Sequence, residues 1–334
     1  MIKNFKKMIS CAAASLLFTA PANAMVITVD PGDGGEANGA TYYYNSDFKR
    51  VSIDTKDKPF DSSKHEGVKE VFEKDLNLKI SKFLKEELEK YKDESGKPVV
   101  VYLTRENDKT LSLSDRIEIG ANNKSDLILS IHNNANENHN SSGSFAIVTH
   151  SNYNNLYDIE EKIADSILDK ILEKLGLPRK TSIADSILKE NVSIDDLFDY
   201  ILKNNLLVKS EKLKQIIIKS GILEKYGNLN LEGDISLLKD TLKEIILQRG
   251  YMKNGILRRI SDDGSTYANG DTTDWYGMVC LGAMKGIPSI ILACCHMDNE
   301  EDYKKILSTD EKLKELSKAI AEGIADNFKL TLSK

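Results

Sequence analysis

Side chains that can bind a metal ion stand at three separated positions of the chain: Asp33, Glu73 and His132. A hydrolytic zinc site combines three such ligands with an open position for water, and a neighbouring carboxylate takes the proton of that water. His132 follows an apolar run directly and opens a loop rich in asparagine, which suits a ligand. A histidine can equally cap a loop, and a glutamate can equally mark the solvated edge of a helix, so neither residue is decisive alone.

The loop that contains Asp33 is more specific. Residues 30–35 read Asp-Pro-Gly-Asp-Gly-Gly, so three glycines and a proline follow an apolar run. Glycines let the backbone turn sharply and approach a ligand closely, and loops with this property often carry function. An ordinary turn is the alternative interpretation.

Apolar runs and helical periodicities alternate along the chain. The expected helices cover residues 70–91, 112–123, 157–175 and 310–328, the second of them capped by Ser112 or Ser114. The expected strands are the apolar runs at residues 25–29, 98–103, 126–131, 145–149 and 289–292. This alternation predicts an α/β fold with a twisted, mostly parallel sheet and helices on both faces. Ligands of such folds bind beyond the carboxyl ends of the strands, and Asp33, His132 and Ala293 each stand at or just after an expected strand end.

The first 24 residues, 1–24, are predicted to be a cleavable signal peptide. Lys3, Lys6 and Lys7 precede the apolar run 8–20, and Ala22-Asn23-Ala24 provides a small-x-small cleavage site. A retained membrane anchor is the alternative, and no later run is apolar enough to cross a membrane. We therefore expect a secreted protein that makes no membrane contact after signal cleavage.

The 310 residues that remain are enough for one large domain that carries an insert. Residues 180–248 interrupt the alternation, because Leu and Ile are interleaved with charged residues throughout and proline is absent. We predict a helical insert at 180–248 and one domain formed by residues 25–179 and 249–334.

Charge and cysteine content exclude several classes of function. After removal of the signal peptide the chain has 43 basic and 52 acidic residues, a balance that gives no electrostatic reason to expect nucleic acid as a partner. Only Cys280, Cys294 and Cys295 remain in the mature chain, so a scaffold held by disulfides is not expected. A small residue at a strand end explains Cys294 and Cys295 better than a nucleophile does, since no base is evident beside them.

Several stretches together carry a resemblance to one enzyme family. They are the loop 30–36, Glu73-Lys-Asp-Leu-Asn-Leu, Leu103-Thr-Arg, Leu113-Ser-Asp-Arg with Ala121-Asn122, Ser130-Ile-His-Asn, Arg249-Gly250 and Gly286-Ile-Pro-Ser. Over residues 25–178 and 249–330 the chain resembles the zinc-dependent N-acetylmuramoyl-L-alanine amidases, which cut peptidoglycan. The resemblance implies one zinc ion and hydrolysis of the bond between the lactyl group of muramic acid and L-alanine. It also implies that Glu73 and His132 are zinc ligands and that Asn133 lies beside the substrate.

Two positions depart from the pattern of that family. Asp33 stands where its members have a histidine ligand, and Ala293 stands where they have the glutamate that acts as general base. Aspartate can bind zinc, but it is shorter than histidine, and a second carboxylate makes zinc-bound water less acidic. A methyl group cannot accept a proton at all. We therefore predict weak or absent zinc binding and activity that is absent or near background.

Three hypotheses follow for the function. The first is a secreted, cell-wall-associated amidase scaffold that no longer hydrolyses its substrate, either a binding or regulatory relative or a chain inactivated by substitution. The second is an active amidase that uses Asp33 as a ligand and another base, for which His296, Glu36 and Asp298 are candidates. The third is a scaffold whose helical insert recruits a protein partner; that insert could also be a lid or a surface facing the wall. Peptidoglycan is the expected partner in the first two.

Overall fold

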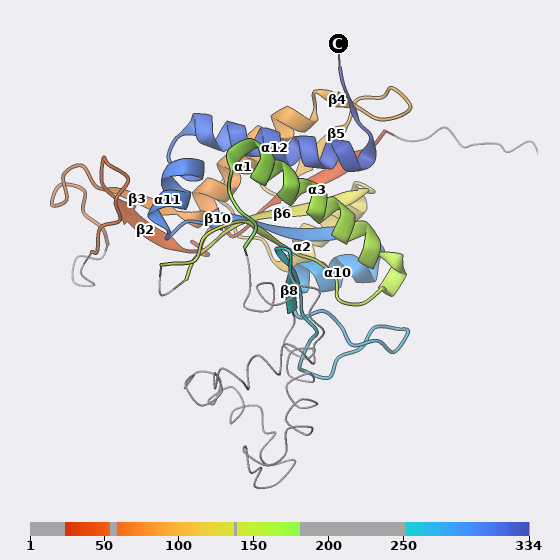
Figure 1. The fold of residues 1–334 in the computed structure, drawn as a ribbon. Helices are drawn as coiled ribbons and strands as arrows, with labels where there is room; N and C mark the ends of the chain where they lie inside the picture. The colour runs from red at the N-terminus through yellow and green to blue at the C-terminus, as the bar shows by residue number, and fades with distance from the viewer. Residues whose placement is uncertain (1–23, 54–58, 137–138, 181–250, 334) are drawn as a thin grey trace, which may run out of the picture.

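The computed structural model describes residues 24–53, 59–136, 139–180 and 251–333 (Figure 1). Of the expected signal peptide only residue 24 is among them, and of the expected insert 180–248 only residue 180. Both predictions therefore lie outside the described residues and stay predictions. Within the described part, no helix combines the length and the apolar character that a membrane span requires.

A seven-stranded sheet forms the centre of the molecule, with the strand order β5-β1-β6-β10-β7-β9-β8. The strands are β1 (Val26–Pro31), β5 (Val100–Leu103), β6 (Leu127–Asn134), β7 (Phe145–Ile147), β8 (Tyr251–Lys253), β9 (Ile256–Arg258) and β10 (Ser289–His296). β1 pairs in parallel with β5 and β6, β6 with β10, and β7 with β9, whereas β7 and β8 run antiparallel to β10 and β9 respectively. The prediction of a mostly parallel sheet is confirmed.

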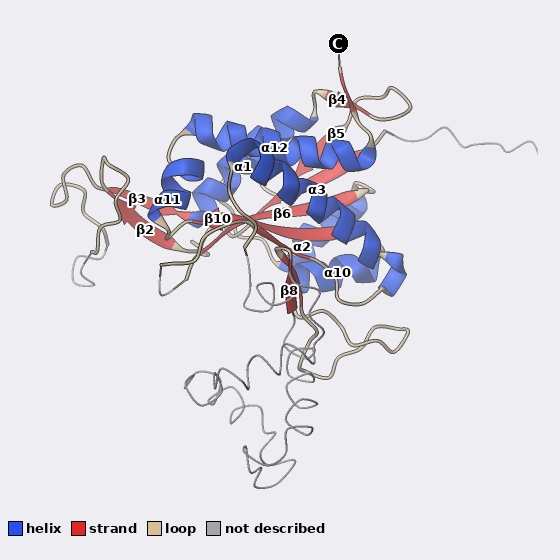
Figure 2. Cartoon of the chain, viewed as in Figure 1, coloured by secondary structure: helices blue, strands red, loops and turns tan. Residues whose placement is uncertain are grey.

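Helices cover both faces of this sheet, as predicted (Figures 1 and 2). They are α1 (Glu73–Leu88), α3 (Tyr157–Leu175) and α12 (Asp310–Phe328) on one face and α2 (Leu113–Asn122) and α10 (Gly277–Lys285) on the other. Successive side chains of β6 point to opposite faces of the sheet, and so each packs against the helices on its own face. Leu127, Leu129 and Ile131 belong to the large core under α1, α3 and α12, whereas Ile128 packs with Ile117 of α2.

Short elements complete the described chain at its periphery. They are the strand pair β2 (Thr41–Tyr44) and β3 (Lys69–Phe72), the pair β4 (Tyr91–Lys92) and β11 (Thr331–Leu332), the short 3-10 helix η2 (Tyr153–Asn155), the π-helix η3 (Tyr303–Leu307), and α11 (Glu300–Asp302). The helix expected from residue 70 begins at Glu73, because residues 69–72 pair with β2 instead. The helices expected at 157–175 and 310–328 have these same bounds in the structure.

The strands β6 and β10 are longer than the apolar runs from which they were predicted. β6 continues past His132 to Asn134, and β10 continues past Ala293 to His296. The strands extend this far because His132 and Ala293 are partners in the parallel pairing. The expectation that both stand at or after a strand end is therefore wrong for both residues. They lie within the last part of their strands, and Asp33 alone follows the end of its strand.

Candidate metal centre

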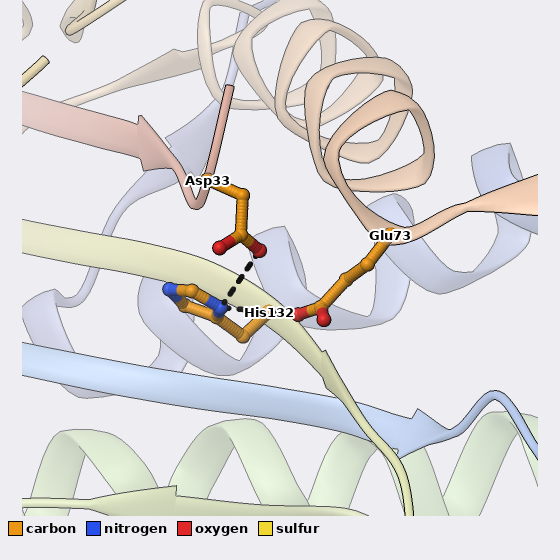
Figure 3. Close-up of side chains that lie close together, drawn as sticks. All are labelled: Asp33, Glu73 and His132. Carbon is orange, nitrogen blue, oxygen red and sulfur yellow. Dashed lines mark hydrogen bonds and ion pairs between the residues drawn. The ribbon is translucent and has the colours of Figure 1, made fainter. Parts of the chain in front are cut away.

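The three candidate ligands converge at the carboxyl end of the central strands (Figure 3). Asp33 follows β1, Glu73 is the first residue of α1, and His132 lies in β6. His132 Nδ1 is 3.1 Å from Glu73 Oε1 and 3.6 Å from Asp33 Oδ2. Within the described part of the chain, no other group of three or more His, Cys, Asp or Glu side chains gathers closely enough to hold a metal ion. The sequence thus predicted which three residues meet, although 99 positions separate the first from the last.

The glycine loop has the conformation that its composition indicates. Asp33 has φ of 58°, a left-handed conformation that aspartate adopts more readily than most residues. Gly32 lies against the imidazole ring, and a Cβ at this glycine would come within 2.3 Å of His132 Cε1. Gly39 approaches the site from the other side, where a Cβ would lie 2.6 Å from both the Asp33 and the Glu73 carboxylates. Glycine at both positions lets the backbone close around the three ligands.

Two buried arginines hold the same loop through its carbonyl groups. Arg105 donates from Nε to Pro31 O and from Nη2 to Gly32 O, both at 2.9 Å. Arg116 donates from Nη1 to Pro31 O at 2.8 Å and from Nη2 to Asp33 O at 2.7 Å. Planar guanidinium groups with several fixed donors suit this task better than a lysine would. Neither arginine was assigned a role from the sequence, because carbonyl acceptors leave no signature in side-chain types.

Asp30 anchors the beginning of the loop from inside the protein. Its carboxylate is almost completely buried and accepts hydrogen bonds from Thr104 Oγ1 at 2.5 Å, Ser130 Oγ at 2.6 Å and Arg116 Nη1 at 2.7 Å. A buried charge with a full set of partners costs far less than an unpaired one and fixes local geometry. The ion pair between Asp30 and Arg116 therefore positions Asp33 indirectly, because Arg116 also donates to the carbonyl group of Asp33.

Glu73 is buried and oriented by backbone groups. Its side chain is 9% exposed, so the alternative of a solvated helix edge is wrong. Oε2 accepts from Ala40 N at 2.9 Å, and Oε1 accepts from Asn133 N at 3.0 Å. Asn133 itself turns inward, with Nδ2 donating to Asn77 Oδ1 at 2.9 Å. Its expected place beside the substrate stays a prediction.

The three ligands perturb one another's ionisation. Burial, followed by the negative charge of Glu73, raises the pKa of Asp33. Burial opposes ionisation of Glu73 as well, but its hydrogen bonds with His132, Ala40 and Asn133 outweigh this and lower its pKa. Burial disfavours the charged form of His132, yet the two carboxylates outweigh it and raise the pKa of the imidazole. Two carboxylates that face one imidazole make the site attractive to a cation.

Ala293 stands beside this centre on the neighbouring strand. It pairs with His132 in the register of β6 and β10, so the two side chains leave the same face of the sheet. The residue is 4% exposed and forms part of the wall of a cavity of about 450 Å³. The other lining residues are His132, Asn133, Asn134, Phe145, Ile147, Lys180, Met252, Leu257, Tyr276 and Ile291. None of these lining side chains is a carboxylate.

The other residues considered for proton transfer do not belong to the group formed by the three candidate ligands. His296 is buried and faces Asp298 at 3.8 Å, and burial lowers the pKa of its imidazole to about 4. The Asp298 carboxylate accepts a hydrogen bond from Asn136 N at 3.1 Å and contacts His139 at 3.0 Å. Glu36 is exposed. Neither His296, Asp298 nor Glu36 lines the cavity beside Ala293.

Comparison with known families decides the classification. The family described as N-acetylmuramoyl-L-alanine amidase matches residues 27–205, which is more than half of the chain. The chain belongs to this amidase family. The match includes Asp33, Glu73 and His132 and ends within residues 180–248. Among proteins with curated descriptions, none shows significant similarity to this sequence.

Solved structures of similar fold include several amidases. Cwp6 from Clostridium difficile has a TM-score of 0.50 at 20% identity, with 91% of this chain covered. The chain spans 29% of the length of Cwp6. An N-acetylmuramoyl-L-alanine amidase from Clostridium difficile 630 has a TM-score of 0.49 at 16% identity, covering 91% of this chain and 97% of its own. The catalytic domain of CwlV from Bacillus (Paenibacillus) polymyxa var. colistinus has a TM-score of 0.47 at 14% identity, covering 92% and 99%.

The donor set of this amidase-family chain fits a zinc ion. Zinc bonds to nitrogen and carboxylate oxygen of about 2.0–2.2 Å place neighbouring ligand atoms of a tetrahedral site roughly 3.4 Å apart. The observed separations from His132 Nδ1, 3.1 Å to Glu73 and 3.6 Å to Asp33, lie on either side of that value. The backbone donors on Glu73 supply the outer hydrogen bonds that orient a ligand. Asp33, Glu73 and His132 are thus the residues that would hold the ion.

Proposed function

We propose that this protein is a secreted, cell-wall-associated amidase scaffold that binds peptidoglycan and hydrolyses it at or near background rate. The reaction expected of its family is zinc-dependent hydrolysis of the N-acetylmuramoyl–L-alanine amide bond. The observation that carries the proposal is the methyl group of Ala293 beside His132, where a general base would have to stand.

The residues that line the cavity offer no carboxylate to substitute for that base. A catalytic carboxylate takes the proton from the attacking water and passes it to the leaving nitrogen. The lining side chains with a polar group are His132, Asn133, Asn134, Lys180 and Tyr276. None is a carboxylate, the histidine already faces Glu73, and the amides cannot accept a proton at neutral pH. Loss of a positioned acid/base typically costs about 10²–10⁴ in rate.

The replacement of a histidine by Asp33 weakens the site further. A bound zinc ion would supply Lewis acidity and a more acidic water. Counted against Zn²⁺, the carboxylates of Asp33 and Glu73 bring the net charge of the site to about zero, which makes such a water less acidic. The aspartate side chain is also shorter than imidazole. We therefore propose that zinc binds weakly and that Ala293 is the more severe of the two losses.

The convergence of Asp33 with Glu73 and His132 favours one competing function, an active amidase with Asp33 as its third ligand. This alternative requires another base, and the described cavity wall provides no carboxylate for that role. The signal peptide 1–24, the insert 180–248 and recruitment of a protein partner through that insert remain proposals of the sequence alone.

Release of L-alanyl peptides from purified peptidoglycan tests the proposed function. We expect no release by the natural chain or by Asp33→His, and measurable release by Asp33→His combined with Ala293→Glu. The cavity gives the introduced glutamate room beside His132. The double variant with His132→Ala added should be inactive again. Robust turnover by the natural chain would disprove the proposal, and a folded double variant without activity would disprove the roles given to positions 33 and 293.

A further inference from the structure

The fully buried amide of Asn77, on α1, lies against the glycine loop. Asn77 follows Glu73 by one helical turn, so the two side chains leave the same face of the helix. Its Nδ2 donates to Asp33 Oδ2 at 3.4 Å and to Gly32 O at 3.3 Å. Asp33 Oδ2 is also the oxygen that faces His132 Nδ1 at 3.6 Å (Figure 3). Asn77 therefore contacts the atom of Asp33 that would bind the ion.

A second buried amide fixes the direction of the first. Asn133, on β6, donates from Nδ2 to Asn77 Oδ1 at 2.9 Å, which leaves Asn77 Nδ2 turned towards Asp33. The buried thiol of Cys295, on β10, donates in turn to Asn133 Oδ1 at 3.7 Å. The donors of this series all point towards the Asp33 carboxylate. Hydrogen bonds that are aligned in this way strengthen one another in a buried environment.

The two amides together hold both carboxylate ligands. Asn77 donates to Asp33, and the backbone N of Asn133 donates to Glu73 Oε1 at 3.0 Å. The hydrogen bond between Asn77 and Asn133 thus connects α1 with β6 and fixes the Asp33 carboxylate relative to that of Glu73. Neutral amides orient these acceptors without adding a positive charge that would repel a cation.

Packing alone does not explain an amide at this position of α1. Asparagine is a weaker helix former than leucine or alanine, and a buried amide costs free energy unless its polar groups find partners. Leu76, Ile80 and Leu84 are buried in the large core along the same helix, so an apolar residue at position 77 would suit its surroundings. The contact of Asn77 with the glycine loop accounts for the choice of residue.

We propose that Asn77 is a positioning residue for metal binding, which holds Asp33 Oδ2 in the place of a zinc ligand and, through Asn133, fixes that place relative to Glu73. The inference rests on the part of the proposed function that names Asp33, Glu73 and His132 as the residues that hold zinc. It does not depend on whether the protein hydrolyses peptidoglycan.

The zinc affinity of the full chain, measured by competition with a chelator of known affinity, tests this role. Asn77→Ala should bind zinc at least ~10-fold more weakly than the natural chain, the lower end of the effect of removing a group that orients a ligand. Asn77→Leu keeps the branched shape of the side chain, removes its hydrogen bonds and should lose affinity in the same way. Ser81→Ala is the matched control, because Ser81 is fully buried one turn further along α1, and it should keep the affinity of the natural chain.

The same substitution in the Asp33→His variant separates positioning from a general effect on the fold. There Asn77→Ala should cost less than ~3-fold in zinc affinity, because the oxygen that Asn77 holds is absent and the coupling between the two residues is lost. An equal loss in both backgrounds would overturn the proposal, since Asn77 would then act through Gly32 or the core. Unchanged affinity in Asn77→Ala and Asn77→Leu would overturn it too, as would a natural chain that binds no zinc.

Thermal unfolding of each variant identifies any loss of affinity that comes from loss of folding. Failure of this inference and failure of the proposed function have different signatures. Unchanged zinc affinity in the Asn77 variants would leave the expected lack of turnover by the natural chain unaffected. Robust turnover by the natural chain would disprove the proposed function and would leave the dependence of zinc affinity on Asn77 unaffected.

Discussion

At the scale of single residues, we propose that the candidate centre differs from a working zinc hydrolase in its side-chain chemistry and not in the placement of its side chains. His132 Nδ1 has carboxylate oxygens at 3.1 Å and 3.6 Å, and backbone donors orient Glu73. On the proposed function, the site lacks a second neutral imidazole and a proton acceptor on β10. These two deficits act on different steps, metal binding and proton transfer, so they can be measured separately.

Asp33→His should bind zinc at least ~10-fold more tightly than the natural chain, the lower end of the effect seen when only groups that orient a ligand are changed. The new side chain is longer, removes one negative charge and tolerates the left-handed backbone at this position. Competition with a chelator of known affinity measures the zinc dissociation constant. Asp33→Asn is the control, because it removes the same charge without supplying an imidazole, and it should bind more weakly than the natural chain. An unchanged affinity in Asp33→His would show that position 33 is not a ligand position.

At the scale of elements, α2 connects a helix cap to the metal centre. Ser112 Oγ accepts from Asp115 N at 3.1 Å, and Asp115 Oδ2 accepts from Ser112 N at 3.1 Å, which is a capping box. One turn further on, Arg116 reaches back to the carbonyl groups of Pro31 and Asp33. The start of this helix therefore sets where the glycine loop lies.

Ser112→Ala should lower the free energy of unfolding by about 1 kcal/mol, the usual cost of losing an N-cap side chain. The sequence left Ser112 and Ser114 open as caps, and the structure assigns the role to Ser112. Ser114→Ala, on the exposed first turn of the same helix, should change stability by less than about 0.5 kcal/mol. Urea unfolding followed by circular dichroism compares the two variants. Equal effects of the two substitutions would contradict the assignment.

At the scale of the whole molecule, local patterns predicted the fold class and the convergence of Asp33, Glu73 and His132, and long-range contacts decided the rest. The helices at 157–175 and 310–328 follow from periodicity, because one apolar face must pack on the sheet. The ends of β6 and β10 did not follow, since their last residues are polar or small and are held by pairing with each other. The roles of Arg105 and Arg116 could not be predicted either, because they act through backbone carbonyl groups of a distant loop.

One buried carboxyl group connects distant parts of the chain and should give the protein a pH-dependent stability. Glu160, at the start of α3, is fully buried and accepts from Thr149 N at 2.7 Å and from Ser289 N at 2.9 Å. It thereby joins the segment after β7 to the start of β10, which comes after residues 181–250 in the sequence. Burial raises its pKa to about 8, far above that of a glutamate in the unfolded chain.

Because the folded state holds this proton more tightly than the unfolded state, the stabilisation from protonated Glu160 is complete below about pH 4.5 and is lost as the pH rises towards 8. The slope attributable to this one group reaches at most about 1.4 kcal/mol per pH unit. Glu160→Gln cannot titrate and keeps an acceptor for one backbone donor, so its unfolding free energy should fall less steeply between pH 5 and 8 than that of the natural chain. Denaturant unfolding at intervals of one pH unit measures both slopes, with Asp158→Asn on the exposed side of α3 as the control for loss of one carboxylate. Parallel curves for Glu160→Gln and the natural chain would mean that Glu160 is ionised in the folded protein, in which case its two backbone donors outweigh the cost of burial.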